Sequence, residues 1–484
     1  MTRRPFPRVA ALKTADAFRQ HLSTLGVTLP FDDTLAEREA SPLGATLDTD
    51  GRTIGNRFSV LPMEGWDGEL DGTPSEFTRR RWRHFGQSGA KFIWGGEAVA
   101  VRHDGRASPN QLQITRRTQP AIAALREDLV RAHRDRHGAN ADRDLVVGVQ
   151  LTHSGRFSKP DASDRPAPLT ACVNPVLDAR VPHAPHVLSD DELDRLIEDF
   201  VVAARLARDA GFDFVDVKQC HGYLGHELLG ARNRPGKYGG SLENRFRFLR
   251  TVIEAIHAGV PGLRLGVRLS AVDLTPYRKD PDGVGEPAPL DAVSQLAGFG
   301  VIVNDNLDAA LEEPRALLTM LESLGVRWIC VTAGSPYYTP HVIRPAYFPP
   351  MDGYQPPEDP LVGVARHIET TARLKRAFPH MVFVGSGYTY LQEWLPHVAQ
   401  SVIRQGLADF VGLGRMMLSY PDFPTDVLAG RPLKRATVCR TFSDCTTGPR
   451  LGLVSGCYPL DEYYKARPEA AAVLKVRTAM NAGE

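Results

Sequence analysis

The sequence has few cysteines, no long apolar segment and no excess of either charge. Six cysteines in 484 residues are too few for a disulfide framework, so we expect a reducing cytoplasm. No apolar run is long enough for a membrane span, and the basic N-terminus has too short an apolar run for a signal peptide. A formal net charge of +1 without a basic block argues against nucleic acid and membrane partners.

What remains is the composition of a soluble globular protein, with 42% hydrophobic and 24% charged residues. The partner that we expect for such a chain is a small-molecule substrate. The oligomeric state stays open, a homo-oligomer included.

Short apolar runs rich in β-branched residues alternate with amphipathic stretches along the chain. Because the runs lack polar alternation, they indicate strands buried on both faces, as in a parallel sheet. Eight such runs occur, at residues 58–61, 91–94, 145–150, 212–217, 264–268, 327–331, 381–384 and 409–413. We therefore predict an α/β fold, a (β/α)8 TIM barrel. An open doubly wound sheet would alternate in the same way, but no GxGxxG follows the first run.

Three segments are expected. Residues 1–45 form an N-terminal extension with a short helix, residues 46–430 form the barrel, and residues 431–484 form a cysteine-containing tail. A capping box at 189–192 predicts the start of one barrel helix, and Pro360 the start of another. Two long connections, 157–186 and 273–300, leave the same face of the predicted barrel. We expect both to shape a substrate pocket.

Polar residues gather where the predicted strands end, which is one face of a parallel barrel and the place of its active sites. The last two units end in glycine-rich turns, and the second of these carries an arginine. Backbone N–H groups beside a guanidinium suit a phosphate. The candidate residues are Pro62, Met63, Glu64, Ala98, Gln150, Lys218, His221, Tyr223, Arg268, Gly385, Ser386, Gly387, Gly414 and Arg415.

One stretch resembles a known family. His221-Gly222-Tyr223-Leu224, followed by YGGSLENR at 238–245, is similar to the signature of the old yellow enzyme family, the NADH:flavin oxidoreductase and 2,4-dienoyl-CoA reductase-like FMN barrels. Supporting matches lie at 61–63, 150–156 and 408–415, so the resemblance spans roughly residues 40 to 430. It implies a βα barrel, as the strand count does.

The resemblance implies FMN as cofactor and NAD(P)H as reductant. Pro62, Met63 and Ala98 would offer backbone contacts, and Gln150 would bind the pyrimidine edge of the flavin. Arg268 would lie near N1 and O2, where a cation favours the reduced, anionic flavin. The phosphate would be held by Gly387, Gly414 and Arg415. We assign three of their sequence neighbours to the same cofactor site: Glu64, which follows Met63, and Gly385 and Ser386, which precede Gly387.

The same resemblance implies the chemistry. Tyr223 matches the proton donor, while Lys218 and His221 take the positions of the pair that holds a substrate carbonyl oxygen. The expected activity is hydride transfer to an activated C=C bond. Lys218 could instead hold a carboxylate of the substrate, or pair with Glu64, which stands where the family has Thr or Cys. His153 and Arg156 either lie near the flavin or anchor a loop.

Glu64 and Lys218 also motivate a second hypothesis, an FMN-dependent dehydrogenase or desaturase acting on an amine or natural-product intermediate. A third hypothesis is an FMN-binding electron-transfer or sensor module without turnover. The presence of both Tyr223 and His221 argues against the third, because an electron carrier needs no proton donor.

The cysteines of the tail resemble an incomplete iron–sulfur motif. Longer members of the family hold a cluster on four cysteines after the barrel. Here Cys445 and Cys457 keep the last spacing and Cys439 precedes them, but Phe442 stands where another cysteine is needed. Three thiolates leave such a site open. We therefore expect a degenerate loop, no metal and no intact cluster.

Overall fold

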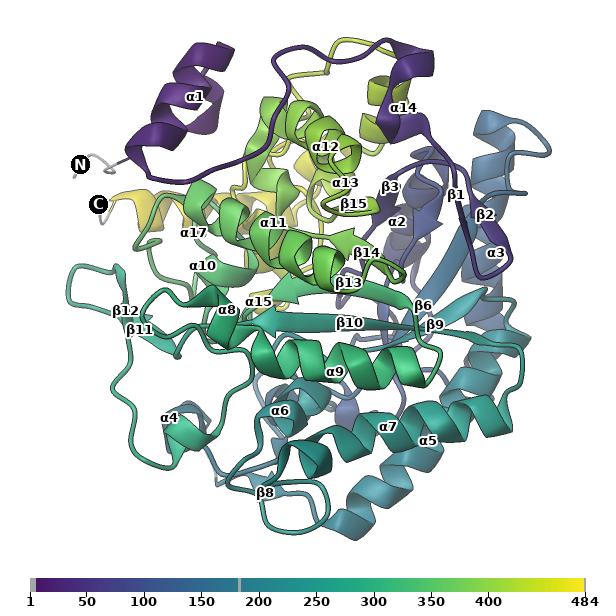
Figure 1. The fold of residues 1–484 in the computed structure, drawn as a ribbon, viewed down its shortest axis with the longest axis vertical. Coiled ribbons are helices and arrows are strands. Elements are labelled where there is room, and N and C mark those ends of the chain that lie inside the picture. Colours follow the sequence, from purple (N-terminus) through teal and green to yellow (C-terminus); the bar gives the residue numbers. More distant parts are fainter. Residues whose placement is uncertain (1–5, 182–183, 483–484) are drawn as a thin grey trace.

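The computed structural model describes residues 6–181 and 184–482. Eight parallel strands close into a barrel surrounded by helices (Figure 1). Closure comes from β4, which pairs with β3 on one side and β6 on the other. The barrel strands are β3 (Phe58–Val60), β4 (Phe92–Ile93), β6 (Val146–Thr152), β9 (Phe214–Val217), β10 (Arg264–Val272), β13 (Trp328–Ala333), β14 (Val382–Gly385) and β15 (Phe410–Leu413). All eight predicted strands are present, and the barrel prediction is confirmed.

Other strands are short. A ninth strand, β5 (Ala98–Ala100), pairs alongside β6. Three two-stranded pairs lie outside the barrel wall: β1 (Leu47–Thr49) with β2 (Arg52–Ile54), β7 (Leu169–Thr170) with β8 (His186–Val187), and β11 (Tyr277–Lys279) with β12 (Gly285–Pro287).

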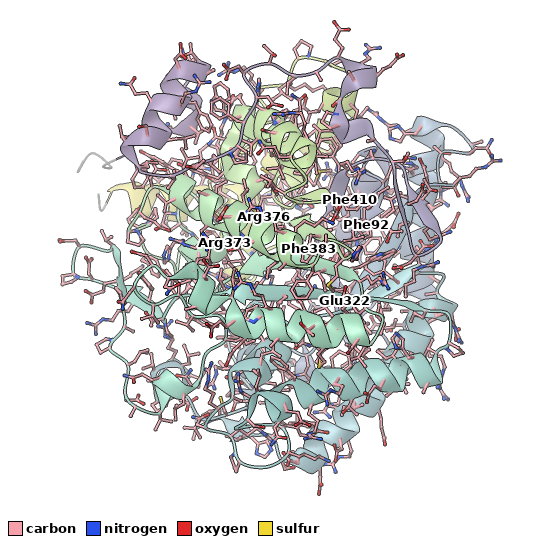
Figure 2. The ribbon with its side chains drawn as sticks, viewed as in Figure 1. Phe92, Glu322, Arg373, Arg376, Phe383 and Phe410 are labelled. Carbon is pink, nitrogen blue, oxygen red and sulfur yellow. The ribbon has the colours of Figure 1, made fainter. Side chains whose placement is uncertain are left out.

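Large side chains fill the inside of the barrel. Phe92 and Phe410 are both labelled in Figure 2. The Phe92 ring lies 4.9 Å from that of Phe410 and 5.4 Å from that of Trp328. Side chains alternate along each strand. On β14, for example, Val384 joins this inner cluster and Phe383 packs into the larger outer core against the helices. Because the interior is packed, we expect a ligand to bind at the end of the barrel and not through it.

The helices return the chain from one strand to the next. The predicted capping box is present: Ser189 begins α5, and its hydroxyl accepts from the Glu192 backbone N–H. The helices around the barrel are α2 (Glu76–Gln87), α3 (Gln119–His137), α5 (Asp190–Asp209), α6 (Leu224–Gly230), α7 (Leu242–Gly259), α9 (Glu312–Ser323), α11 (Pro360–Ala377), α12 (Leu395–Arg404), α13 (Met416–Ser419) and α14 (Phe423–Leu428). Short helices α4 (Pro175–Asp178), α8 (Leu307–Ala310) and α10 (Pro340–Ile343) lie in the connections.

The described parts of the N-terminal extension and of the tail pack on the barrel. Helix α1 (Ala15–Thr24) of the N-terminal extension stacks Phe18 on Trp394, with 4.7 Å between ring centres. The tail forms α15 (Asp444–Arg450), α16 (Glu462–Lys465) and α17 (Glu469–Ala482). No helix within the described residues is long and apolar enough to cross a membrane.

Candidate active site

A cavity of about 240 Å³ opens at the carboxyl ends of the barrel strands. The residues predicted from sequence that line it are Pro62, Met63, Glu64, Gln150, Lys218, His221, Tyr223, Arg268, Ser386, Gly387, Gly414 and Arg415. Ala98 and Gly385 lie outside this lining. Ala98 is buried in β5, where its carbonyl accepts from the Gln111 side chain, and Gly385 ends β14 close to the Tyr388 hydroxyl.

The two glycine-rich turns contribute Gly387 and Gly414 to the cavity lining. Gly387 has a left-handed φ of +89°, and a Cβ there would lie 2.9 Å from the His367 ring. At Gly414 the nearest atom to a Cβ would be the Met63 sulfur, at 3.9 Å. Arg415 donates to the Pro345 carbonyl at 2.9 Å, and its buried Nη1 has no partner in the described structure. Open backbone with a free cationic donor fits a phosphate group.

The buried carboxylate of Asp216 orients two residues of the cavity lining, Gln150 and Arg268. Asp216 accepts from Gln150 Nε2 at 2.5 Å, from Trp94 Nε1 at 2.7 Å and from the Arg268 backbone at 2.7 Å. Burial raises the pKa of Asp216 to about 6. Because the Gln150 amide nitrogen is engaged, its oxygen is left to accept from a ligand.

Arg268 stands beside this carboxylate network as a largely free cation. Its Nη1 donates to the Pro62 carbonyl at 3.1 Å, while its buried Nε lacks a partner among the described residues. A cation, an amide and open phosphate turns in one cavity are the donor set that FMN requires, so these residues fit the cofactor.

His221 is held in a strained backbone conformation. Its φ is +70°, which is uncommon outside glycine. Its backbone N–H donates to Ser270 Oγ at 3.0 Å, and its carbonyl accepts from Ser335 Oγ at 2.7 Å. Burial, followed by the charges of Arg268 and Lys218, holds the pKa of His221 well below its ordinary value, so the imidazole is neutral. Its buried Nε2 has no partner in the part of the chain that is described.

Glu64 is the centre of a hydrogen-bonded group. Its carboxylate pairs with Lys218, accepts from the Tyr223 hydroxyl at 2.6 Å and accepts from Trp66 Nε1 at 3.2 Å. The Tyr223 hydroxyl also lies 3.0 Å from that of Tyr337. Burial, and then the Glu64 charge, raises the pKa of Tyr223 well above its ordinary value, so the phenol keeps its proton. Of the two interpretations of Lys218, the structure favours the ion pair with Glu64.

His153 and Arg156 lie outside the cavity lining. Arg156 pairs with Asp178 and with Glu227, the latter at 2.7 Å, and His153 contacts Asp104 at 3.4 Å. These contacts favour the loop-anchoring interpretation of both residues.

Of the two long connections expected to shape this pocket, the first supports it from behind the lining, where Phe157 stacks on the lining residue Tyr337 with 3.8 Å between ring centres. No described residue of 157–186 or 273–300 lines the pocket itself. The 273–300 connection lines a separate cavity of about 660 Å³ instead. The tail covers the barrel cavity, because its chain folds back over the strand ends and contributes Cys445, Thr446, Pro449, Arg450 and Ser455 to the lining.

The three tail cysteines line a small cavity of about 20 Å³ together with Phe442, roughly the room of one water molecule. Burial raises the pKa of each thiol. Within the described residues, no group of three or more His, Cys, Asp or Glu side chains is arranged to hold a metal ion.

Sequence analysis missed several residues of the cavity, and the polar ones among them include Tyr337, Arg344 and Arg450. Tyr337 lies four residues beyond β13, so extending the strand-end search would have found it. Arg344 follows the short helix α10, and Arg450 ends α15 in the tail. No local pattern marks either arginine, because both reach the cavity only through long-range folding.

Gly387→Ala should raise the dissociation constant of FMN by about tenfold or more, which is about 1.4 kcal/mol, because its methyl would crowd His367 and displace the turn whose backbone would face the phosphate. Gly406→Ala is the matched control. Gly406 has a φ of +64°, and a Cβ there would meet no described atom within 4 Å. Fluorescence titration of the apoprotein measures both, and equal FMN affinity of the two variants would contradict the phosphate assignment.

Comparisons with known proteins match this chain to one family and to proteins named NADPH dehydrogenase. The family model described as "NADH:flavin oxidoreductase / NADH oxidase family" matches residues 47–289. An NADPH dehydrogenase of Halalkalibacterium halodurans is 34% identical over 230 residues, 46% of this chain and 61% of that relative, which is less than two thirds of its length. An NADPH dehydrogenase of Geobacillus sp. is 29% identical over 381 residues, 77% of this chain and 90% of that relative.

A solved structure also matches. It is the old yellow enzyme homologue from Zymomonas mobilis, 21% identical, with a TM-score of 0.55 over 81% of this chain and 94% of that one. At this identity the match shows a common fold.

Proposed function

Because the chain belongs to the NADH:flavin oxidoreductase / NADH oxidase family, we propose that it oxidises NAD(P)H through FMN and reduces an activated C=C bond of a small molecule. The proposal rests on the position and protonation of Tyr223. Its protonated phenol lines the same cavity as Arg268 and the two glycine turns. A proton donor beside a flavin-type site is what alkene reduction requires.

The cofactor would be held along one wall and one end of the cavity. Gln150 and Arg268 would bind the edge of the flavin ring, and Gly387, Gly414 and Arg415 its phosphate. When bound, FMN supplies two-electron hydride chemistry between NAD(P)H and the alkene. The guanidinium of Arg268 would favour negative charge on a flavin ring bound beside it.

The substrate would be activated by side chains of this chain. Neutral His221 can donate one N–H to a carbonyl oxygen as negative charge develops there. Tyr223 would then transfer its proton to the α-carbon. The Lys218 ammonium lies 3.8 Å from the centre of the Tyr223 ring, so it stabilises the negative charge that this transfer leaves on the phenol. Glu64 would orient the phenol before the reaction.

The excess of positive charge among the lining residues argues against the alternative of an amine dehydrogenase. Glu64 is the one carboxylate among the described lining residues, and Lys218 already pairs with it. Several arginines line the same space. A cationic amine would therefore be repelled.

A module that only carries electrons needs no proton donor. The presence of Tyr223, hydrogen-bonded to Glu64 beside Lys218, therefore argues against that third hypothesis. We further propose a cytoplasmic location, which the six free cysteines support. The oligomeric state stays open, and measurement of the molecular mass in solution would determine it.

The purified protein should be yellow and should release FMN, not FAD, on denaturation. Anaerobic mixing with NADPH or NADH should then bleach the flavin, and an added enone should restore the colour. Absorbance of the released flavin and of the mixed enzyme measures both steps. A colourless protein that cannot be reconstituted with FMN would refute the proposal. Bleaching by an amine but not by either nucleotide would favour the dehydrogenase.

A further inference from the structure

The cavity carries more positive charge than the cofactor site uses. The described cations that line it are Arg81, Lys218, Arg268, Arg344, Arg415 and Arg450. Arg81 pairs with Asp67 and Glu97, and Lys218 pairs with Glu64. Arg268 and Arg415 are assigned above to the flavin ring and the phosphate. Arg344 and Arg450 therefore remain without a role in the proposed reaction.

Arg344 has no ion-pair partner in the described part of the chain. It donates to the Thr446 hydroxyl, and its buried Nε is unpaired within the described residues. Burial, followed by the nearby charges of Arg450 and Arg415, lowers the pKa of Arg344 to about 9. The side chain is therefore still charged at neutral pH, close to two like charges. Such a group gains from a bound anion.

Arg450 lies on the substrate side of the same space. It donates to the Pro336 carbonyl at 3.2 Å and is close enough to Tyr337 and Tyr223 to interact with both electrostatically. Its one ion-pair partner among the described residues is Asp352, whose side chain is 55% exposed. Solvent weakens that pair, because exposed ion pairs are worth little. Arg450 thus keeps donors for a ligand that lies next to the phenols.

We propose that Arg344 and Arg450 form an anion site that holds a carboxylate or phosphate group of the molecule docked beside Tyr223. The inference rests on the proposed function and assigns an anionic group to the molecule that docks beside Tyr223. Guanidinium forks match planar oxyanions and bind them in bidentate fashion. Arg450 comes from the tail, so closure of the tail over the barrel completes the site. The anion has two possible sources, a carboxylate on the alkene substrate or a phosphate of the nicotinamide nucleotide.

Calorimetry on the FMN-loaded protein tests the site with benzoate and the neutral isostere benzamide. Benzoate should bind about tenfold or more tightly than benzamide, because a charge-assisted contact away from solvent is stronger than a neutral one. Arg450→Met should remove this preference, and Arg450→Lys should restore part of it. Arg467→Met is the control, because Arg467 also lies in the tail but pairs with Glu469 at 2.7 Å, outside the cavity lining.

Kinetics on the same proteins distinguish the two sources. If the anion belongs to the alkene substrate, Arg450→Met should lower the ratio of kcat/KM for a carboxylate-bearing cyclohexenone to that for cyclohexenone. If it belongs to the nucleotide, the variant should weaken NADPH or NADH binding in the reductive half-reaction and leave that ratio unchanged.

Equal binding of benzoate and benzamide by the parent protein would overturn the inference, and so would unaltered half-reactions in both Arg450→Met and Arg344→Met. A parent protein that bleaches with NAD(P)H but lacks the anion preference refutes this inference alone. A parent protein that binds no FMN refutes the proposed function instead.

Discussion

Replacing Tyr223 with phenylalanine should slow reoxidation of the reduced enzyme by an enone about a hundredfold or more. Flavin reduction by NAD(P)H should keep its rate, because that hydride transfer needs no proton from the phenol. The Tyr223 hydroxyl donates to Glu64 at 2.6 Å and lies 3.0 Å from the Tyr337 hydroxyl. Stopped-flow absorbance of the flavin measures the two half-reactions separately.

Tyr338→Phe is the matched control for this experiment. Tyr338 is also buried, but its hydroxyl donates to Asp273 at 3.1 Å and it lines the second cavity. The control should leave both half-reactions close to those of the parent. Equal slowing of both halves in Tyr223→Phe would mean that Tyr223 serves packing and not proton transfer.

Lys218→Met should lower the free energy of unfolding by about 3–5 kcal/mol, because it leaves the Glu64 carboxylate buried without its cation. The Lys218 side chain is 1% exposed and that of Glu64 is 14% exposed, so solvent compensates little. The double variant Lys218→Met/Glu64→Gln should recover most of the loss. Denaturant unfolding of the parent, both single variants and the double variant gives the coupling energy.

Kinetics of the same variants decide between the two interpretations of Lys218. If it holds only Glu64, the double variant should regain turnover along with stability. A Lys218→Met variant of normal stability whose kcat and kcat/KM both fall would show that the ammonium binds the carbonyl oxygen in the transition state, and that the ion pair is secondary.

The barrel itself could be predicted from short-range patterns. Strands such as β14 and β15 are buried on both faces, so they appear in the sequence as unbroken apolar runs between turn residues. Residues at strand ends, including Gln150, Lys218 and Arg268, were placed in the site because parallel strands end on one face. The glycine turns followed from the same rule.

Contacts between distant segments could not be predicted in this way. The sequence left the partner of Lys218 open, and the structure brings Glu64, 154 residues away, into an ion pair with it. The sequence indicated that the two long connections shape the pocket, whereas it gave no sign that the tail supplies lining residues. Neither connection carries a local sequence pattern that shows where it packs. Its packing site depends on which parts of the barrel surface other segments of the chain already cover.

The sequence by itself determined the eight strands, the face that carries the site and the resemblance to an FMN-binding family, since each depends on residue types within a few positions of one another. The tertiary structure alone decided which charges meet. Arg344 and Arg450, 106 positions apart, share a cavity with the 223–337 tyrosine pair. Electrostatic interactions depend on separation in space and on burial, and neither quantity can be obtained from position along the chain.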